Sequence, residues 1–100
     1  MHTPMEIFKA LSAIPRISGK EKAAADFVQD RAEELGLEYR RDEMDNVIVI
    51  KPAARGYEAA DTVMLQGHLD MVGEAKPGVC HDFEKEGLRL VQEGDVLRAE

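Results

Sequence analysis

The chain has 100 residues and a mass of 11.1 kDa, which allows one domain or a piece of one. Its 20 acidic and 13 basic residues give a net charge of −7, and without a basic cluster this balance excludes electrostatic binding of nucleic acid or anionic lipid. No apolar run approaches the roughly 20 residues that cross a bilayer, no secretory signal is recognisable, and the single Cys80 cannot form an internal disulfide. We therefore expect a soluble, acidic, cytoplasmic α/β chain with no nucleic-acid or membrane partner.

The first element is predicted to be a short helix. Thr3 is a suitable N-cap, Pro4 then occupies the first helical position, and Glu6 completes a capping box. Apolar residues follow at helical spacing until Pro15, which cannot continue the backbone hydrogen-bonding pattern of a helix.

A second helix is predicted from the same kind of signal. Ser18 is the expected cap, with Glu21 three residues later, and one apolar stripe extends to Leu35. Gly36 is expected to end this helix in the left-handed conformation.

Extended structure is predicted after Gly36. Residues 37–41 have the pattern of an exposed strand, Asp45 and Asn46 indicate a turn, and the β-branched run 47–50 predicts a strand that is covered on both faces. Residues 62–66 predict a second interior strand, which ends at Gly67.

The last third of the chain is predicted to be irregular except at its end. Glycine and proline interrupt residues 71–86, which indicates a long loop. Two apolar runs on either side of Glu93-Gly94-Asp95 then predict a β-hairpin. Two helices and about five strands favour a partial mixed sheet flanked by helices.

The candidate chemistry lies where the predicted strand 62–66 ends. His68 and Asp70 follow it two positions apart, a spacing that places both side chains on the same side of extended backbone. Ligands of open α/β sheets bind at the carboxyl ends of strands. A neutral imidazole is a good zinc ligand, and a carboxylate commonly holds its second nitrogen. The pattern alone also fits a structural histidine paired with an acid.

The run Val63–Val72, followed by His81-Asp82-Phe83, resembles the co-catalytic zinc aminopeptidase and carboxypeptidase superfamily. Within it, the chain is most similar to the aminoacyl-histidine dipeptidases (Xaa-His or cytosol non-specific dipeptidases). The likeness spans the whole chain, and the segment 66–72 is its most specific part. The fold it implies is the N-terminal part of a three-layer α/β/α zinc-peptidase domain.

This resemblance implies a metal-dependent dipeptidase with two Zn²⁺ ions, for which Co²⁺ or Mn²⁺ are alternatives. It makes His68 a zinc ligand and Asp70 the catalytic carboxylate that orients the ligand ring. The implied reaction is hydrolysis of dipeptides of the Xaa-His type by a metal-activated water.

The remaining ligands and the general base of this family have no counterpart here, whereas catalytic zinc takes about three protein ligands. Residues 1–100 are therefore expected to be the N-terminal portion of a catalytic domain that is inactive alone and self-associates through its unfinished sheet. The complete protein is expected to be a homodimer that binds small peptides.

Two alternatives stay open at this stage. One is that Cys80 and His81 combine with His68 in a metal site of another kind, although no Cys-x-x-Cys or paired histidine spacing supports it. The other is that the chain is a non-catalytic association module that keeps the fold.

Overall fold

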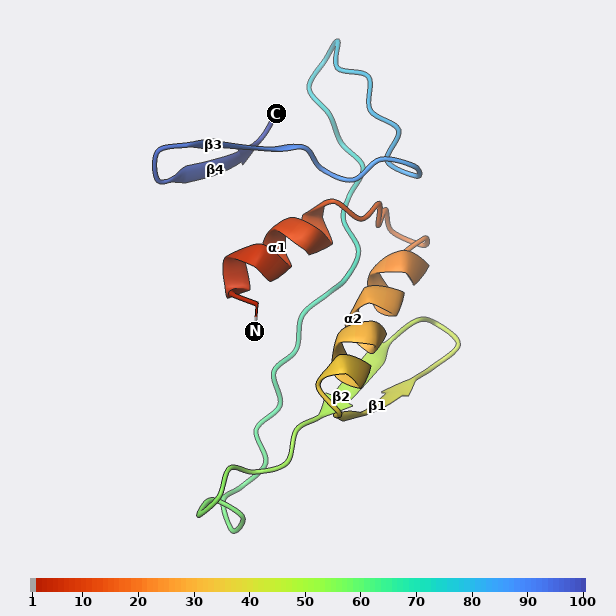
Figure 1. Cartoon of the computed structure of the whole chain (residues 1–100). Helices are drawn as coiled ribbons and strands as arrows, with labels where there is room; N and C mark the ends of the chain where they lie inside the picture. Colours follow the sequence, from red (N-terminus) through yellow and green to blue (C-terminus); the bar gives the residue numbers. More distant parts are fainter. Residues whose placement is uncertain (1) are drawn as a thin grey trace. The chain divides into compact units, whose positions relative to one another are not determined.

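The computed structural model describes residues 2–100 and contains two helices and two antiparallel strand pairs (Figure 1). The elements are α1 (Pro4–Ser12), α2 (Lys22–Glu34), β1 (Glu38–Arg41), β2 (Val47–Ile50), β3 (Leu90–Glu93) and β4 (Val96–Ala99). This content confirms the α/β class. The strands, however, pair as β1–β2 and β3–β4 rather than in one mixed sheet. Contacts divide the chain into two units, one formed by the residues up to Ala24 with Leu69–Glu100 and the other by Ala25–His68.

Helix α1 begins as its sequence predicts. The Thr3 hydroxyl accepts a hydrogen bond from the Glu6 amide at 3.2 Å, and the Glu6 carboxylate accepts one from the Thr3 amide at 2.6 Å. These contacts satisfy two amides that would otherwise lack partners in the first turn. The helix ends at Ser12, with Ala13 as its C-cap, so it stops before Pro15.

Helix α2 begins at Lys22, and the prediction that Ser18 caps it is wrong. Ser18 and Gly19 form a turn instead, with a hydrogen bond of 2.8 Å from the Lys20 amide to the Ile17 carbonyl. The Ser18 hydroxyl is used elsewhere, on Asp70. At the other end of the helix, Gly36 has a φ of 67° and ends α2 as predicted.

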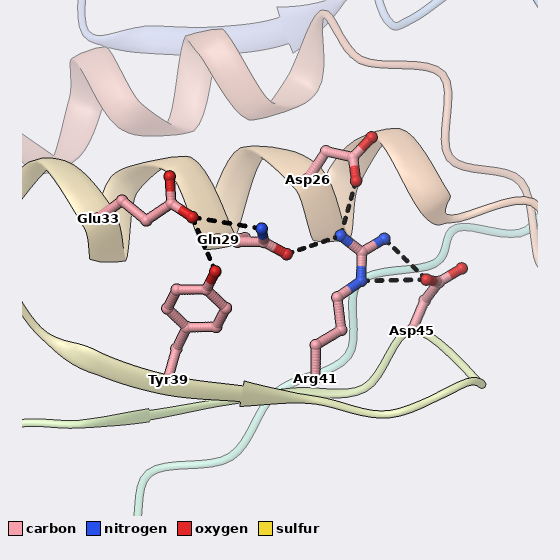
Figure 2. Close-up of polar contacts among 6 residues, drawn as sticks. All are labelled: Asp26, Gln29, Glu33, Tyr39, Arg41 and Asp45. Carbon is pink, nitrogen blue, oxygen red and sulfur yellow. Dashed lines mark hydrogen bonds and ion pairs between the residues drawn. The ribbon is translucent and has the colours of Figure 1, made fainter.

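In the unit Ala25–His68, the hairpin β1–β2 is joined to α2 by a polar network (Figure 2). The Arg41 guanidinium donates to Asp26 at 2.6 Å, to Gln29 at 3.0 Å and to Asp45 at 2.7 Å. Hydrogen bonds to the carboxylates of Asp26 and Asp45 raise the pKa of Arg41. One guanidinium therefore holds the helix, the strand and the turn at Asp45, whose φ of 65° makes the tight bend between the strands.

A neighbouring bond extends this network along the helix. The Tyr39 hydroxyl donates to Glu33 at 2.7 Å, and this bond raises the pKa of the phenol. Arg41 and Tyr39 project from the same face of β1, as residues two apart on a strand do. The network thus fixes which face of β1 lies against α2.

Two expectations for the central strands are not met. Residues 62–66 form no strand in the described structure, so the predicted strand there is wrong, and Val63, Met64 and Leu65 are 80%, 83% and 93% exposed. Strand β2 exists, but Ile48, Val49 and Ile50 are exposed rather than covered on both faces. The physical reason is pairing: a strand requires a hydrogen-bonded neighbour. Within residues 2–100, the pairing of β2 is with β1, and 62–66 belongs to no ladder.

In the other unit, β3 and β4 form the hairpin predicted around Gly94, whose φ is 61°. The chain before β3 packs on the end of α1. The Leu88 amide donates to the Ser12 carbonyl at 2.8 Å, and Gly87 lies directly against the backbone of Ala13. A side chain at position 87 would not fit, so this glycine permits the close approach of the two segments.

The apolar core is small. Among residues 2–100, the apolar side chains that are fully buried are Ala24, Ala25 and Ala32. No helix in that range has the length and apolar character needed to span a bilayer.

Candidate functional site

The two candidate residues lie where the chain passes from one unit into the other. His68 is the last residue of the unit Ala25–His68 and is exposed, and Asp70 follows in the second unit, partly buried. Gly67, directly before His68, has no atom within 4 Å of where a Cβ would lie. The segment 66–70 is without regular secondary structure, so its conformation depends on contacts of its side chains and backbone with other segments.

The carboxylate of Asp70 is held by Ser18. The Ser18 hydroxyl donates to Asp70 Oδ2 at 2.6 Å, which is the length of a hydrogen bond strengthened by a negatively charged acceptor. The two residues are 52 positions apart in the sequence, so the bond joins the loop before α2 to the candidate site.

The backbone beside Asp70 is held by the same loop. Ile17 and Met71 form a parallel β-bridge, in which the Met71 amide donates to the Arg16 carbonyl at 2.8 Å and the Ser18 amide donates to the Met71 carbonyl at 3.2 Å. On the other side of Asp70, Arg16 Nη1 donates to the Leu69 carbonyl at 3.1 Å. The segment 69–71 is thus fixed at its backbone and at its central side chain by residues 16–18.

Arg16 supplies the positive charge on the Asp70 side of the site. Burial lowers the pKa of its guanidinium, while the charge of Asp70 acts in the opposite direction. Its Nε is buried and makes no hydrogen bond. The opposite charges of Arg16 and Asp70 therefore attract each other in this part of the structure.

Cys80 and His81 lie in the irregular loop of the same unit as Asp70. Cys80 is exposed. The His81 ring faces Glu86, with Nε2 at 3.2 Å from its carbonyl oxygen and Nδ1 at 3.4 Å from its carboxylate, and it packs on Phe83 with 4.5 Å between ring centroids. These contacts of the His81 ring are thus with residues that lie two and five positions away in the sequence.

A complete metal site is not assembled in the part of the chain that the structure describes: among residues 2–100, no three His, Cys, Asp or Glu side chains are grouped so that they would hold an ion. The donor chemistry of His68 and Asp70 nevertheless fits part of a zinc site. An imidazole is a common zinc ligand, and a carboxylate is a usual hydrogen-bond partner for the second nitrogen of such a ring.

No family model matches the chain. It is 34% identical over 94 residues to the cytosol non-specific dipeptidase of Escherichia coli (strain K12), an alignment that covers 94% of this chain. Its fold superposes on the crystal structure of the aminoacylhistidine dipeptidase from Vibrio alginolyticus with a TM-score of 0.85 and 34% identity over 93% of this chain. The resemblance to the aminoacyl-histidine dipeptidases is confirmed.

The match covers only a small part of each dipeptidase. The chain spans about 19% of the length of each of these two proteins. The match therefore includes nearly every residue of this chain and leaves most of each dipeptidase without a counterpart in it.

The sequence pattern does not identify two residues of the site. It assigns Ser18 to helix capping and gives Arg16 no role. Both contact the segment 69–71 across more than 50 positions, and a nonlocal contact of this kind leaves no local pattern in the sequence.

Proposed function

We propose that this chain is part of the catalytic domain of a metal-dependent dipeptidase. The observation that supports it most is the 34% identity to a dipeptidase over 94 residues, together with the fold match at a TM-score of 0.85. The matched region includes almost the whole chain, and the segment with His68 and Asp70 is the one whose residue types suit metal chemistry. The substrate class proposed is small peptides of the Xaa-His type, after the name of the Vibrio relative.

In this proposal, His68 binds a zinc ion through one imidazole nitrogen and Asp70 orients the ring from the other. Zinc would supply a bound water of lowered pKa and an electrophile for the scissile carbonyl. The chain itself contributes the positioning of the acid. Its loop 16–18 holds Asp70, so the acid is fixed before the metal binds, and the ligand ring loses less freedom on binding.

Three further proposals concern the complete protein and the 100-residue chain. We expect the complete protein to be cytoplasmic, in line with the word cytosol in the name of the Escherichia coli relative, and to form a homodimer, as the resemblance implies. The 100-residue chain alone is inactive, because it provides one metal ligand where a catalytic zinc takes about three. The remaining metal ligands come from other parts of the complete protein.

The test uses the complete protein, stripped of metal by a chelator and then supplied with Zn²⁺, and follows the hydrolysis of an aminoacyl-histidine dipeptide. Zinc should restore activity to the wild type. It should restore little or no activity to His68→Phe. Asp70→Asn should lower activity by about 10- to 100-fold, the usual effect of removing the partner of a metal ligand.

His81→Phe is the matched control, because it changes a histidine of the same chain whose ring contacts Glu86 and Phe83. It should keep its zinc-restored activity. If His68→Phe is as active as His81→Phe, or if the wild type does not respond to metal, the proposed function is wrong. A non-catalytic association module would then be the better description.

A further inference from the structure

We propose that Ser18 is a positioning residue for the metal site, acting through the carboxylate of Asp70. This inference rests on the proposed function, in which Asp70 orients the imidazole of His68. It adds a residue to that site which the local sequence pattern assigns to helix capping.

The main observation is a short hydrogen bond between side chains. Ser18 Oγ donates to Asp70 Oδ2 at 2.6 Å, and both residues belong to the same compact unit. A carboxylate has two oxygens with about four acceptor sites. A hydroxyl on Oδ2 is therefore compatible with a second donor on the same group, as the proposed role of Asp70 requires. The bond fixes the rotation of the carboxylate, which decides where its other oxygen points.

The geometry of this bond is supported by the backbone on both sides. The Ser18 amide donates to the Met71 carbonyl at 3.2 Å, and the Met71 amide donates to the Arg16 carbonyl at 2.8 Å. The Ser18 hydroxyl is thus presented from a segment that is already paired with the segment of its acceptor. Neither partner has to lose much freedom to make the bond, which favours it even at an exposed position.

A purely structural role explains Ser18 less well. The residue is exposed, α2 begins four positions later at Lys22, and the hydroxyl caps no helix. The loop 16–18 also keeps its backbone pairing with Met71 when the hydroxyl is removed, because that pairing uses main-chain atoms. Loss of the hydroxyl should therefore disturb the orientation of Asp70 more than the stability of the fold.

The experiment compares metal binding in the complete, metal-free protein, with zinc affinity measured by competition against a chromogenic chelator. Ser18→Ala should weaken zinc binding by about 3- to 10-fold, less than direct loss of the orienting acid, which typically costs about 10- to 100-fold. Dipeptide hydrolysis should show a lower kcat with little change in KM. Ser18→Thr, which keeps a hydroxyl, should restore both readouts.

Two further variants make the result decisive. Ser12→Ala removes a buried hydroxyl that has no hydrogen-bond partner and should bind zinc like the wild type. Ser18→Val has the shape of threonine without the hydroxyl, so it should resemble Ser18→Ala and gives the answer if Ser18→Ala does not fold.

The outcomes separate this inference from the proposed function. If His68→Phe loses zinc while Ser18→Ala and Ser18→Val bind it like the wild type, the positioning role of Ser18 is overturned and the proposed function stands. If His68→Phe also binds zinc normally, both are overturned.

Discussion

Replacing three glycines by alanine, one at a time, tests the packing described for the 100-residue chain. At Gly87, a Cβ would lie 2.1 Å from the Ala13 carbonyl oxygen and 2.2 Å from its carbon, both backbone atoms. At Gly73, it would lie 2.7 Å from Ile17 Cδ1, the end of a flexible side chain. At Gly67, nothing lies within 4 Å. The three sites thus range from a backbone clash to open space.

The expected magnitudes follow from what has to move. Gly87→Ala must separate two backbone segments by more than an ångström, and it endangers the hydrogen bond of 2.8 Å from the Leu88 amide to the Ser12 carbonyl. We expect a loss of about 3 kcal/mol in the free energy of unfolding, at the upper end of the usual cost of overpacking. Gly73→Ala should cost about 1 kcal/mol, because the Ile17 side chain can rotate away. Gly67→Ala should change stability by less than about 0.5 kcal/mol.

Urea unfolding of the three variants, followed by circular dichroism, measures this order directly. A loss of about 3 kcal/mol is a large share of the roughly 5–15 kcal/mol that stabilises a small domain, so Gly87→Ala should shift the midpoint most. Gly67→Ala serves as the matched control. Equal midpoints for Gly87→Ala and Gly67→Ala would refute the close contact between residue 87 and the end of α1.

Three other predictions concern separate parts of the chain. Ser12→Ala should raise the free energy of unfolding by about 1 kcal/mol, since it removes a buried hydroxyl without a partner and improves helix propensity; a lower urea midpoint would contradict this. Hydrogen bonds from the Asn46 side chain and amide lower the pKa of Asp42. The turn should therefore be most stable above pH 3.8, the ordinary pKa of this carboxyl, and should weaken as the pH falls through the lower pKa of the folded state. In an NMR titration, Asn46→Ala should raise that pKa; an unchanged midpoint would argue against the bonds. Finally, Leu65 is 93% exposed and should promote self-association of the chain. In analytical ultracentrifugation, Leu65→Lys should shift the chain toward monomer. A wild type that stays monomeric at every concentration would contradict this.

Local signals in the sequence predicted the local elements well. The capping box of Thr3 and Glu6, the left-handed Gly36 and the turn at Gly94 each depend on residues within a few positions of one another. Such signals act through the backbone of their own segment, so they are independent of what the rest of the chain does. The two helices, the strands on either side of the turn at Asp45 and the hairpin around Gly94 could therefore be predicted.

The signals that failed depend on distant partners. The apolar run 62–66 has the composition of an interior strand, but a strand exists only with a hydrogen-bonded neighbour, and none pairs with it among residues 2–100. Ser18 has the pattern of a helix cap, yet its hydroxyl donates to Asp70, 52 positions away. Composition indicates what a residue can do, whereas the partner that it finds depends on the tertiary structure.

The candidate site was predicted only in part, for the same reason. His68 and Asp70 were selected from their spacing and from the resemblance, and the role of each stays a prediction. The loop that holds Asp70 is visible in the structure alone, because its four hydrogen bonds join residues 16–18 to residues 69–71. Proximity of this kind is not encoded in any short motif.

The central proposal is that His68 binds zinc in the complete protein. A crystal of that protein grown with Zn²⁺, measured at the zinc absorption edge, locates the ion by its anomalous scattering. We predict a zinc peak at about 2.0–2.1 Å from a nitrogen of the His68 ring, the usual length of such a bond. A bound zinc ion whose ligands do not include His68 would contradict the account.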